Sequence, residues 1–307
     1  MAQRLAYVAS AGEAAVGFAA ARTSYEQAGA QALIRRHDLY FVRGSADGAT
    51  GLFLLDTGAP GLLLHGESAS TAAAVTLRGA TGEVIAQRAE VRELAVANLR
   101  QSHVQALRLD LSAMRALVGE DVLGVIGFAQ LAPGATTVDF GAETISFGES
   151  PLEAVPEDLG TTYGFELHGH LPTLSVMMGE AHLRLGFDSG SEVNVLDRSV
   201  LPTLSEGLRG RPAHKEVSGV DAGVIRAPYA LVRLTLLDDD PYRDRAFAFL
   251  PWGGFRQNLP RLDGLLGADF WGAERITLDY GNRQIRTYVA PDESGPPDSG
   301  IGQPSDK

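Results

Sequence analysis

The feature that most constrains the fold is an internal repeat in the chain of 307 residues. The segment FLLDTGAPGLLL at 53–64 aligns with LGFDSGSEVNVL at 185–196, since both carry an acid and a turn between apolar residues. Further along, GVIGFAQL at 124–131 aligns with GLLGADFW at 264–271. Two copies of the same pattern in the same order predict two similar structural units within one chain.

The spacing within the copies supports this repeat. Gly127 to Asp139 and Gly267 to Asp279 both span 12 positions. Both acids lie in an apolar-Asp-aromatic strand pattern followed by a tight turn, TVDFGAETISF in the first copy and TLDYGNRQIRTY in the second. We expect these two acids to bond to their own turns and to play no part in chemistry.

Short apolar-polar alternations bounded by turn residues predict a mainly β fold. We expect two homologous β lobes with few short helices, one of them at 111–121 and brief helical turns after Gly127 and Gly267. The expected divisions are a helical or poorly ordered N-terminal segment at 1–27, a first lobe at 28–147, a linker rich in Pro, Gly and acids at 148–164, a second lobe at 165–290 and a disordered tail at 291–307.

Each copy carries an Asp-Thr/Ser-Gly triplet where an apolar strand ends. Either triplet alone is explained by an ordinary β-turn in which Asp caps the backbone and Gly takes a positive φ. Two triplets, each followed in register by an apolar-apolar-Gly segment, favour a shared site instead. The triplets are Asp56-Thr57-Gly58 and Asp188-Ser189-Gly190.

With these motifs, residues 32–290 resemble the aspartic peptidases, and the compact copies and the Asp-Thr-Gly-Ala quartet look closer to the retropepsin-like branch than to pepsin. The resemblance implies a fused retropepsin dimer, with two β-barrel lobes and an active-site cleft between them. It implies that Asp56 and Asp188 are the catalytic acids. The implied supports of the catalytic loops are Thr57, Gly58, Ser189, Gly190, Ser191, Gly127 and Gly267.

The chemistry of such a pair is acid–base catalysis without a covalent intermediate, metal or cofactor. Two carboxyls held close together share one proton, so one acts as the base and the other as the acid. The base activates a water that attacks the peptide carbonyl. Thr57 and Ser189 are expected to bond the opposite loop, and a hydroxyl at Ser191 to favour the charged form of Asp188, leaving the shared proton on Asp56.

Two hairpins at 76–85 and 217–225 are candidate flaps that would pair with an extended polypeptide substrate. Neither contains the Tyr of a pepsin-like flap, and an ordinary surface hairpin is the alternative for each. The candidate substrate-binding residues are Gly79, Thr81, Gly82, Gly219, Asp221 and Gly223.

Two other functions remain open at this point. A catalytically silent module could keep the duplicated fold and bind a peptide or protein. A self-processing precursor could cover its cleft with its own N-terminal residues. Both acids, both hydroxyls and both glycines are intact in the sequence, which favours an enzyme.

Composition limits the partners. A net charge of -12 and a pI near 5.0 disfavour nucleic acid, which is bound through clustered Lys and Arg. No apolar run reaches the roughly 18 to 20 residues that span a bilayer. With both lobes in one chain we expect a monomer. The absence of cysteine and the high Ala, Gly and Arg usage favour, weakly, a bacterial protein outside the cytoplasm, although no export signal is evident.

The histidines invite a comparison with metal sites. His168 and His170 lie on one strand face, and His182 follows before Asp188. Their spacing matches no known zinc motif, so we expect surface histidines and no metal.

Overall fold

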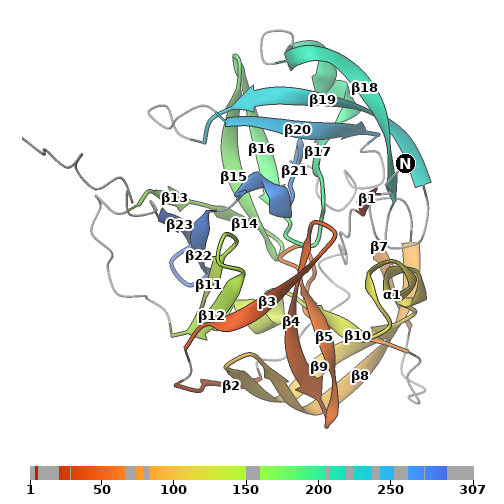
Figure 1. The fold of residues 1–307 in the computed structure, drawn as a ribbon, viewed down its shortest axis with the longest axis vertical. Coiled ribbons are helices and arrows are strands. Elements are labelled where there is room, and N and C mark those ends of the chain that lie inside the picture. The colour runs from red at the N-terminus through yellow and green to blue at the C-terminus, as the bar shows by residue number, and fades with distance from the viewer. Residues whose placement is uncertain are drawn as a thin grey trace, which may run out of the picture.

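The structure is a computed structural model that describes residues 4–5, 21–27, 29–66, 74–78, 83–149, 160–204, 208–218, 224–236, 243–251, 262–272 and 274–288. It is mainly β, with few short helices, and its strands form one 9-stranded and one 14-stranded sheet. The mainly β class expected from the alternating pattern is confirmed. Figure 1 places the strands of the second half of the chain in the upper part of the molecule and most of the first half below.

The first half forms a run of eight strands in the order β3-β4-β5-β10-β6-β9-β8-β7. Their burial alternates where one face packs on the core, as in β9, and becomes continuous in the second part of β5, which is covered on both faces. The bounds are β3 (Gln31–Arg36), β4 (Leu39–Ala46), β5 (Ala49–Leu55), β6 (Leu62–His65), β7 (Ala74–Arg78), β8 (Glu83–Val96), β9 (Leu99–Leu109) and β10 (Val122–Ile126).

The second half repeats this order strand for strand, as β14-β15-β16-β21-β17-β20-β19-β18. In both halves the short middle strand, β10 or β21, runs parallel to one neighbour and antiparallel to the other. The repeat in the sequence is therefore a repeat of strand order. The bounds are β14 (Glu166–His168), β15 (Leu171–Met178), β16 (Ala181–Phe187), β17 (Asn194–Asp197), β18 (Leu208–Ser218), β19 (Val224–Leu234), β20 (Arg243–Leu250) and β21 (Gly264–Leu266).

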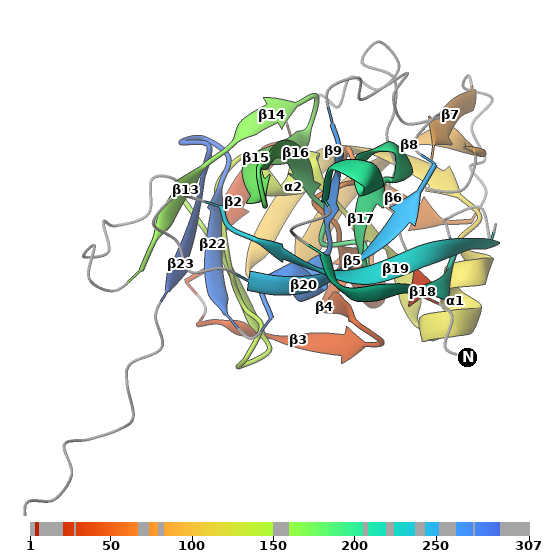
Figure 2. The same cartoon turned by 90° about the horizontal axis from the view of Figure 1, so that it is seen from above.

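The halves are joined by a seam of strands that lies to one side of the molecule in both views (Figures 1 and 2). Strand β11 pairs antiparallel with β22, and Thr137 lies opposite Thr277 at the centre of the register. The hydroxyl oxygens of these two threonines are 2.8 Å apart. The seam strands are β11 (Ala135–Asp139), β12 (Thr144–Gly148), β13 (Thr162–Gly164), β22 (Arg275–Asp279) and β23 (Gln284–Tyr288).

The helices are short, and three of them fall where the sequence predicts them. The predicted helix at 111–121 is α1 (Ser112–Val118). The turns predicted after Gly127 and Gly267 are α2 (Phe128–Leu131) and the 3₁₀ helix η4 (Ala268–Phe270). A further 3₁₀ helix, η2 (Arg198–Leu204), follows β17.

The N-terminal part of the chain contributes two short strands. β1 (Arg4–Leu5) runs parallel to β18, and β2 (Arg22–Tyr25) pairs antiparallel with β9. Most of the Ala-rich stretch for which a helix was considered, 6–20, lies outside the described residues, as do 150–159 of the predicted linker and the predicted tail. The last predicted linker residues instead form β13, which pairs with β23.

The hydrophobic core is continuous between the halves. One cluster combines first-half side chains such as Phe53 with second-half side chains such as Phe187 and Trp271. Two smaller clusters each belong to one half, around Phe41 in the first and Val195 in the second. Packing therefore fixes the halves against each other, which is a condition for any site built from both.

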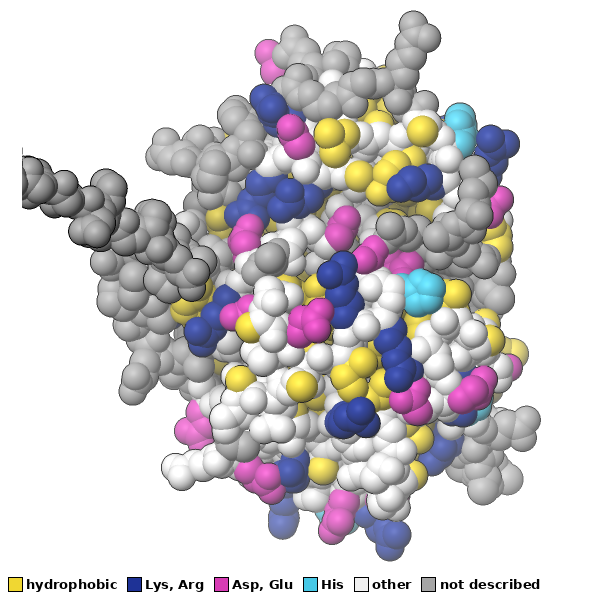
Figure 3. All heavy atoms as spheres, in the orientation of Figure 1, with side chains coloured by type: hydrophobic (Ala, Val, Ile, Leu, Met, Phe, Trp, Pro, Cys, Tyr) yellow, Lys and Arg dark blue, Asp and Glu magenta, His cyan; other side chains and the backbone are white. Residues whose placement is uncertain are grey.

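Among the described residues, no helix is long and apolar enough to cross a membrane. On the face seen in Figure 3, basic and acidic side chains are interspersed. That face therefore presents no uniform basic stripe of the kind that follows a phosphate backbone.

Candidate active site

Two equivalent loops bring the repeated acids to the middle of the molecule. Strand β5 ends at Leu55, and the Asp56 N–H donates to the carbonyl of Ile126 on β10 (3.0 Å). In the second half, the Asp188 N–H donates to the carbonyl of Leu266 on β21 (2.9 Å). The short middle strand of each half thus fixes the point at which the acid leaves its strand.

The glycine after each middle strand lets the loop pack directly on the backbone. A Cβ on Gly127 would lie 2.4 Å from the Ala59 carbonyl oxygen, and a Cβ on Gly267 would lie 2.7 Å from that of Ser191. Any side chain would push the loop away. The apolar-apolar-Gly segments therefore support the loops as the resemblance implies.

The two loops are tied to each other by crossed hydroxyl bonds. The Thr57 hydroxyl donates to the Phe187 carbonyl (2.7 Å) and accepts the N–H of Ser189 (2.9 Å). The Ser189 hydroxyl donates to the Leu55 carbonyl (2.9 Å) and accepts the N–H of Thr57 (3.0 Å). Each hydroxyl is buried and uses both its donor and its acceptor on the opposite loop, as expected from the sequence.

The crossed loops place each carboxyl against the glycine of the other loop. A Cβ on Gly58 would lie 2.6 Å from Asp188 Oδ1, and a Cβ on Gly190 would lie 2.4 Å from Asp56 Cγ. Only glycine allows this approach. Both aspartates are fully buried, with 0% of each residue exposed.

Burial and proximity raise the pKa of both carboxyls. Burial raises the pKa of Asp56 to about 7, against the opposing effect of hydrogen bonds from Asp188 and from two backbone N–H groups. Burial also raises the pKa of Asp188 well above its ordinary value, and the charge of Asp56 and a hydrogen bond to it act in the same direction. The two groups therefore titrate as a pair, and one charge is easier to place there than two.

The hydrogen bond expected from the Ser191 hydroxyl to Asp188 is not made. The Ser191 hydroxyl donates to the Val193 carbonyl (2.8 Å) and so turns back on its own loop. Asp56 Oδ1 accepts two N–H bonds, from Gly58 (2.8 Å) and Ala59 (3.0 Å). The carboxyl of Asp188 accepts the N–H of Gly190 (3.1 Å), and the backbone N–H of Gly58 also acts to lower the pKa of Asp188. Within its own loop Asp56 thus accepts one N–H bond more than Asp188 does, which favours the charged form of Asp56.

Each carboxyl also has a second oxygen that meets no N–H or hydroxyl donor of the described residues. Within the described part of the chain, Asp56 Oδ2 and Asp188 Oδ2 are buried and have no hydrogen-bond partner. The hydroxyl of Tyr280 is in the same state, and burial, with a smaller effect of the Asp56 charge, raises the pKa of this phenol. A buried polar atom without a partner is costly, and such atoms concentrate at functional sites.

A turn from each half reaches the loop of the other half. From the second half, His170 Nε2 lies 2.8 Å from the Gly58 carbonyl oxygen. From the first half, the Asp38 N–H donates to Glu192 Oε1 (3.4 Å), and His37 Nδ1 lies 3.8 Å from the same oxygen. These contacts add a second set of bonds between the halves, outside the crossed hydroxyls.

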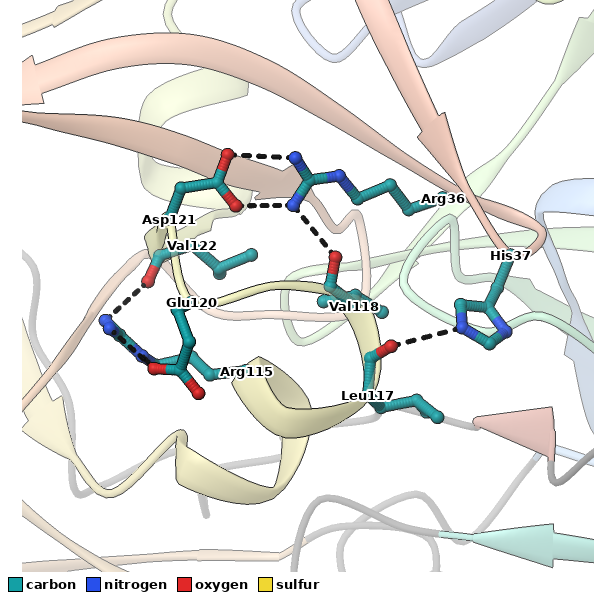
Figure 4. A network of polar contacts seen from close by, with 8 residues as sticks. All are labelled: Arg36, His37, Arg115, Leu117, Val118, Glu120, Asp121 and Val122. Carbon is teal, nitrogen blue, oxygen red and sulfur yellow. Dashed lines mark hydrogen bonds and ion pairs between the residues drawn. The ribbon is translucent and has the colours of Figure 1, made fainter.

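The first-half turn, which contains His37 and Asp38, is anchored to helix α1, as Figure 4 shows. The Arg36 guanidinium bonds both carboxylate oxygens of Asp121 (2.5 and 2.9 Å) and the Val118 carbonyl (2.8 Å). His37 Nε2 lies 3.2 Å from the Leu117 carbonyl oxygen. The turn is therefore held from one side by α1 and meets the loop of Asp188 on the other.

Sequence reasoning missed three residues near the pair, namely His170, Glu192 and Tyr280. The sequence predicts that His170 is a surface histidine, whereas its ring is largely buried and lies against the Gly58 carbonyl. Glu192 has no carboxylate counterpart in the first loop, where Pro60 occupies its position, so the repeat gave no signal. Tyr280 was part of the apolar-Asp-aromatic pattern, whose periodicity cannot distinguish a core ring from one beside the site.

The candidate flap residues lie outside the described part of the chain. The arms of the hairpins are described, and they pair antiparallel, β7 with β8 and β18 with β19. Among the described residues, no three His, Asp or Glu side chains gather as a metal site would require. The repeated acids Asp139 and Asp279 accept N–H bonds in their own turns, from Ala142 (2.7 Å) and Asn282 (3.0 Å), as predicted.

Comparison with known proteins adds no family to this description. The chain matches no protein-family model, and a search of the curated proteins finds no significant match. The assignment of a function therefore depends on the residues and their geometry.

The crossed hydroxyls predict a specific loss of stability. Thr57→Val keeps the shape of the side chain but leaves the Ser189 N–H and the Phe187 carbonyl buried without a partner. We expect the free energy of unfolding to fall by about 2 to 4 kcal/mol, measured by urea unfolding. Thr57→Ser, which keeps the hydroxyl, is the matched control and should lose less than half as much. A Thr57→Val protein as stable as the wild type would contradict the role given to the crossed bonds.

The raised pKa values predict a pH dependence of stability. A carboxyl whose folded pKa exceeds its unfolded pKa stabilises the fold below the unfolded value, and this stability is lost as pH rises through the folded value. The free energy of unfolding should therefore fall between about pH 4 and pH 7, by about 1.4 kcal/mol per pH unit for each proton that only the folded state holds. The double variant Asp56→Asn, Asp188→Asn should lack this slope in urea unfolding. An identical slope in both proteins would show that the pair is not the cause.

Proposed function

We propose that the chain is an aspartic endopeptidase of the retropepsin-like kind, with two β-barrel lobes in one chain and the reactive carboxyls between them. The single observation that carries the proposal is the meeting of two buried carboxyls, one from each half, with an oxygen of each left without a partner among the described residues. An ordinary pair of turns would expose its acids or satisfy them locally.

In this mechanism the pair carries one proton, on Asp188, and one charge, on Asp56. Water held between the two unpartnered oxygens loses a proton to Asp56 as it attacks the peptide carbonyl carbon. Asp188 donates its proton to the carbonyl oxygen, which gives a neutral tetrahedral intermediate. The proton on Asp56 then passes to the leaving nitrogen as the C–N bond breaks, and Asp188 regains a proton from the collapsing hydroxyl.

The surroundings of the pair suit this chemistry. Leu54, Leu55 and Phe187 are buried beside the acids, so the site excludes bulk water and strengthens its electrostatic interactions. The crossed hydroxyls fix the separation of the carboxyls and do not compete for their reactive oxygens. No metal or covalent nucleophile is needed for any step.

The proposed substrate is an extended polypeptide. Because both carboxyls are fully buried, a substrate can reach them only if an element moves. The hairpins β7–β8 and β18–β19 are the proposed moving elements, and an extended chain could pair its backbone with them while its side chains enter apolar subsites. We propose that one chain suffices, since it supplies both acids.

The competing proposal is a silent binding module. It would need neither a raised pKa nor unpartnered carboxyl oxygens, and burying two acids at a binding site that never uses them would be costly. The intact pair therefore favours the enzyme.

Cleavage of a mixed peptide library between pH 3 and pH 9 tests the proposal. We expect cleavage by the wild type and a loss of about 10²- to 10⁴-fold in kcat/KM for Asp56→Asn and for Asp188→Asn. Asp139→Asn is the matched control, because it changes the other repeated acid, which serves its own turn. The rising limb of the pH–rate profile should lie well above the ordinary range of an aspartate, near the pKa of about 7 for Asp56.

Two results would contradict the enzyme. Equal cleavage by the wild type and both pair variants would place the activity elsewhere. Peptide binding by calorimetry without cleavage at any pH would support the binding module.

A further inference from the structure

We propose that His170 is a positioning residue that makes Asp56 the base of the pair, acting through the peptide unit between Gly58 and Ala59. This inference rests on the proposed function for its kinetic consequence. Its structural part concerns only which carboxyl carries the charge.

The two ends of one peptide unit carry the argument. The Gly58 carbonyl lies 2.8 Å from His170 Nε2, and the N–H of the same unit, on Ala59, donates to Asp56 Oδ1 (3.0 Å). A donor on the carbonyl oxygen polarises the peptide and strengthens its N–H as a donor. The histidine therefore stabilises charge on Asp56 without touching it.

The chemistry of the two partners fixes the direction of the bond. A carbonyl oxygen can only accept, so Nε2 must carry the proton. Burial lowers the pKa of His170, which keeps the ring neutral over a wider pH range. The ring is also packed near Phe128, whose centroid is 6.3 Å away, and this contact restricts its rotation.

Among the described residues, no such bond supports the loop of Asp188. The residue that corresponds to His170 in the repeat is Asp38, whose backbone N–H bonds Glu192. At the position of Ala59 lies Ser191, and both N–H groups donate to the backbone carbonyl of their own aspartate (3.2 and 3.1 Å). The Ala59 N–H also donates to the carboxyl, at Asp56 Oδ1 (3.0 Å). The histidine is thus one of the differences between the two halves of the site, and such a difference is needed to give the two acids different roles.

Among the described residues, two titratable side chains face Asp56 from the surrounding elements. They are Asp188 from the other loop and the neutral phenol of Tyr280 after β22. His170 acts from the β14–β15 turn through the peptide. A change in the titration of Asp56 on replacing His170 can therefore be assigned to the peptide, provided that Asp188 and Tyr280 stay in place.

The test uses the full chain with carbon-13 in the aspartate carboxyls. The two resonances are assigned with Asp56→Asn and Asp188→Asn and titrated by NMR. In His170→Leu we expect the lower of the pair's two titration midpoints to move up by about 0.3 to 0.6 pH unit, because the bond to the charged oxygen weakens. His170→Gln can still donate to the carbonyl and should restore the wild-type midpoint. His182→Leu, at an exposed position on β16, is the matched control and should leave the midpoint unchanged.

The kinetic profile gives a second measurement. The rising limb of the pH profile of kcat/KM should move to higher pH in His170→Leu, together with the lower titration midpoint. In His170→Gln it should return to the wild-type position. A purely structural role would lower kcat/KM without moving the limb. If no substrate is cleaved at all, the proposed function fails, but the NMR midpoints still decide the role of His170.

A third measurement needs no variant. Nitrogen-15 histidine spectra of the wild type should show the neutral ring of His170 with its proton on Nε2. A neutral ring protonated on Nδ1, or a midpoint unchanged in His170→Leu, would overturn the inference.

Discussion

The site depends first on the crossed hydroxyl bonds between the two loops. Thr57 and Ser189 each satisfy a carbonyl and an N–H of the opposite loop at 2.7 to 3.0 Å. These four bonds hold two segments that are more than a hundred residues apart in the sequence. Without them the carboxyls would have no fixed separation, and no proton would need to be shared.

From this constraint the electrostatics follow. Because the loops cross, each carboxyl lies against the glycine of the other loop and away from solvent. Burial disfavours charge on either acid, and the presence of the other acid disfavours a second charge further. The backbone then makes the two carboxyls unequal, since Asp56 Oδ1 accepts two N–H bonds from its own loop. A fold of two similar halves thus holds an asymmetric pair, as the proposed acid–base catalysis requires.

Much of this was predictable from the sequence because the repeat is local and strict. The triplets, the apolar-apolar-Gly supports and the short helix after each are set by turn chemistry and strand patterning, and the structure has them where predicted. The charge distribution was not predictable. The Ser191 hydroxyl could bond a carboxylate or its own loop, and only the backbone geometry shows that it bonds Val193.

Residues that act across the halves were also beyond the sequence. His170 meets Gly58 only because the second half folds onto the first, and nothing in the pattern around His168 and His170 indicates a partner so far along the chain. The hairpin arms were predictable from their turn residues, whereas the chemistry of their tips lies in residues outside those described. Local sequence patterns therefore predict the loops, whereas the electrostatics of the two carboxyls depend on tertiary packing.

The most direct measurement is a neutron structure of deuterated crystals near pH 8, in which the hydrogens of the two carboxyls are seen. The account predicts one deuterium on the pair, bound to Asp188, with no deuterium on Asp56 and a water that bridges the Oδ2 atoms of the two residues. Two bare carboxylates turned away from each other, or a deuterium held on each, would contradict it.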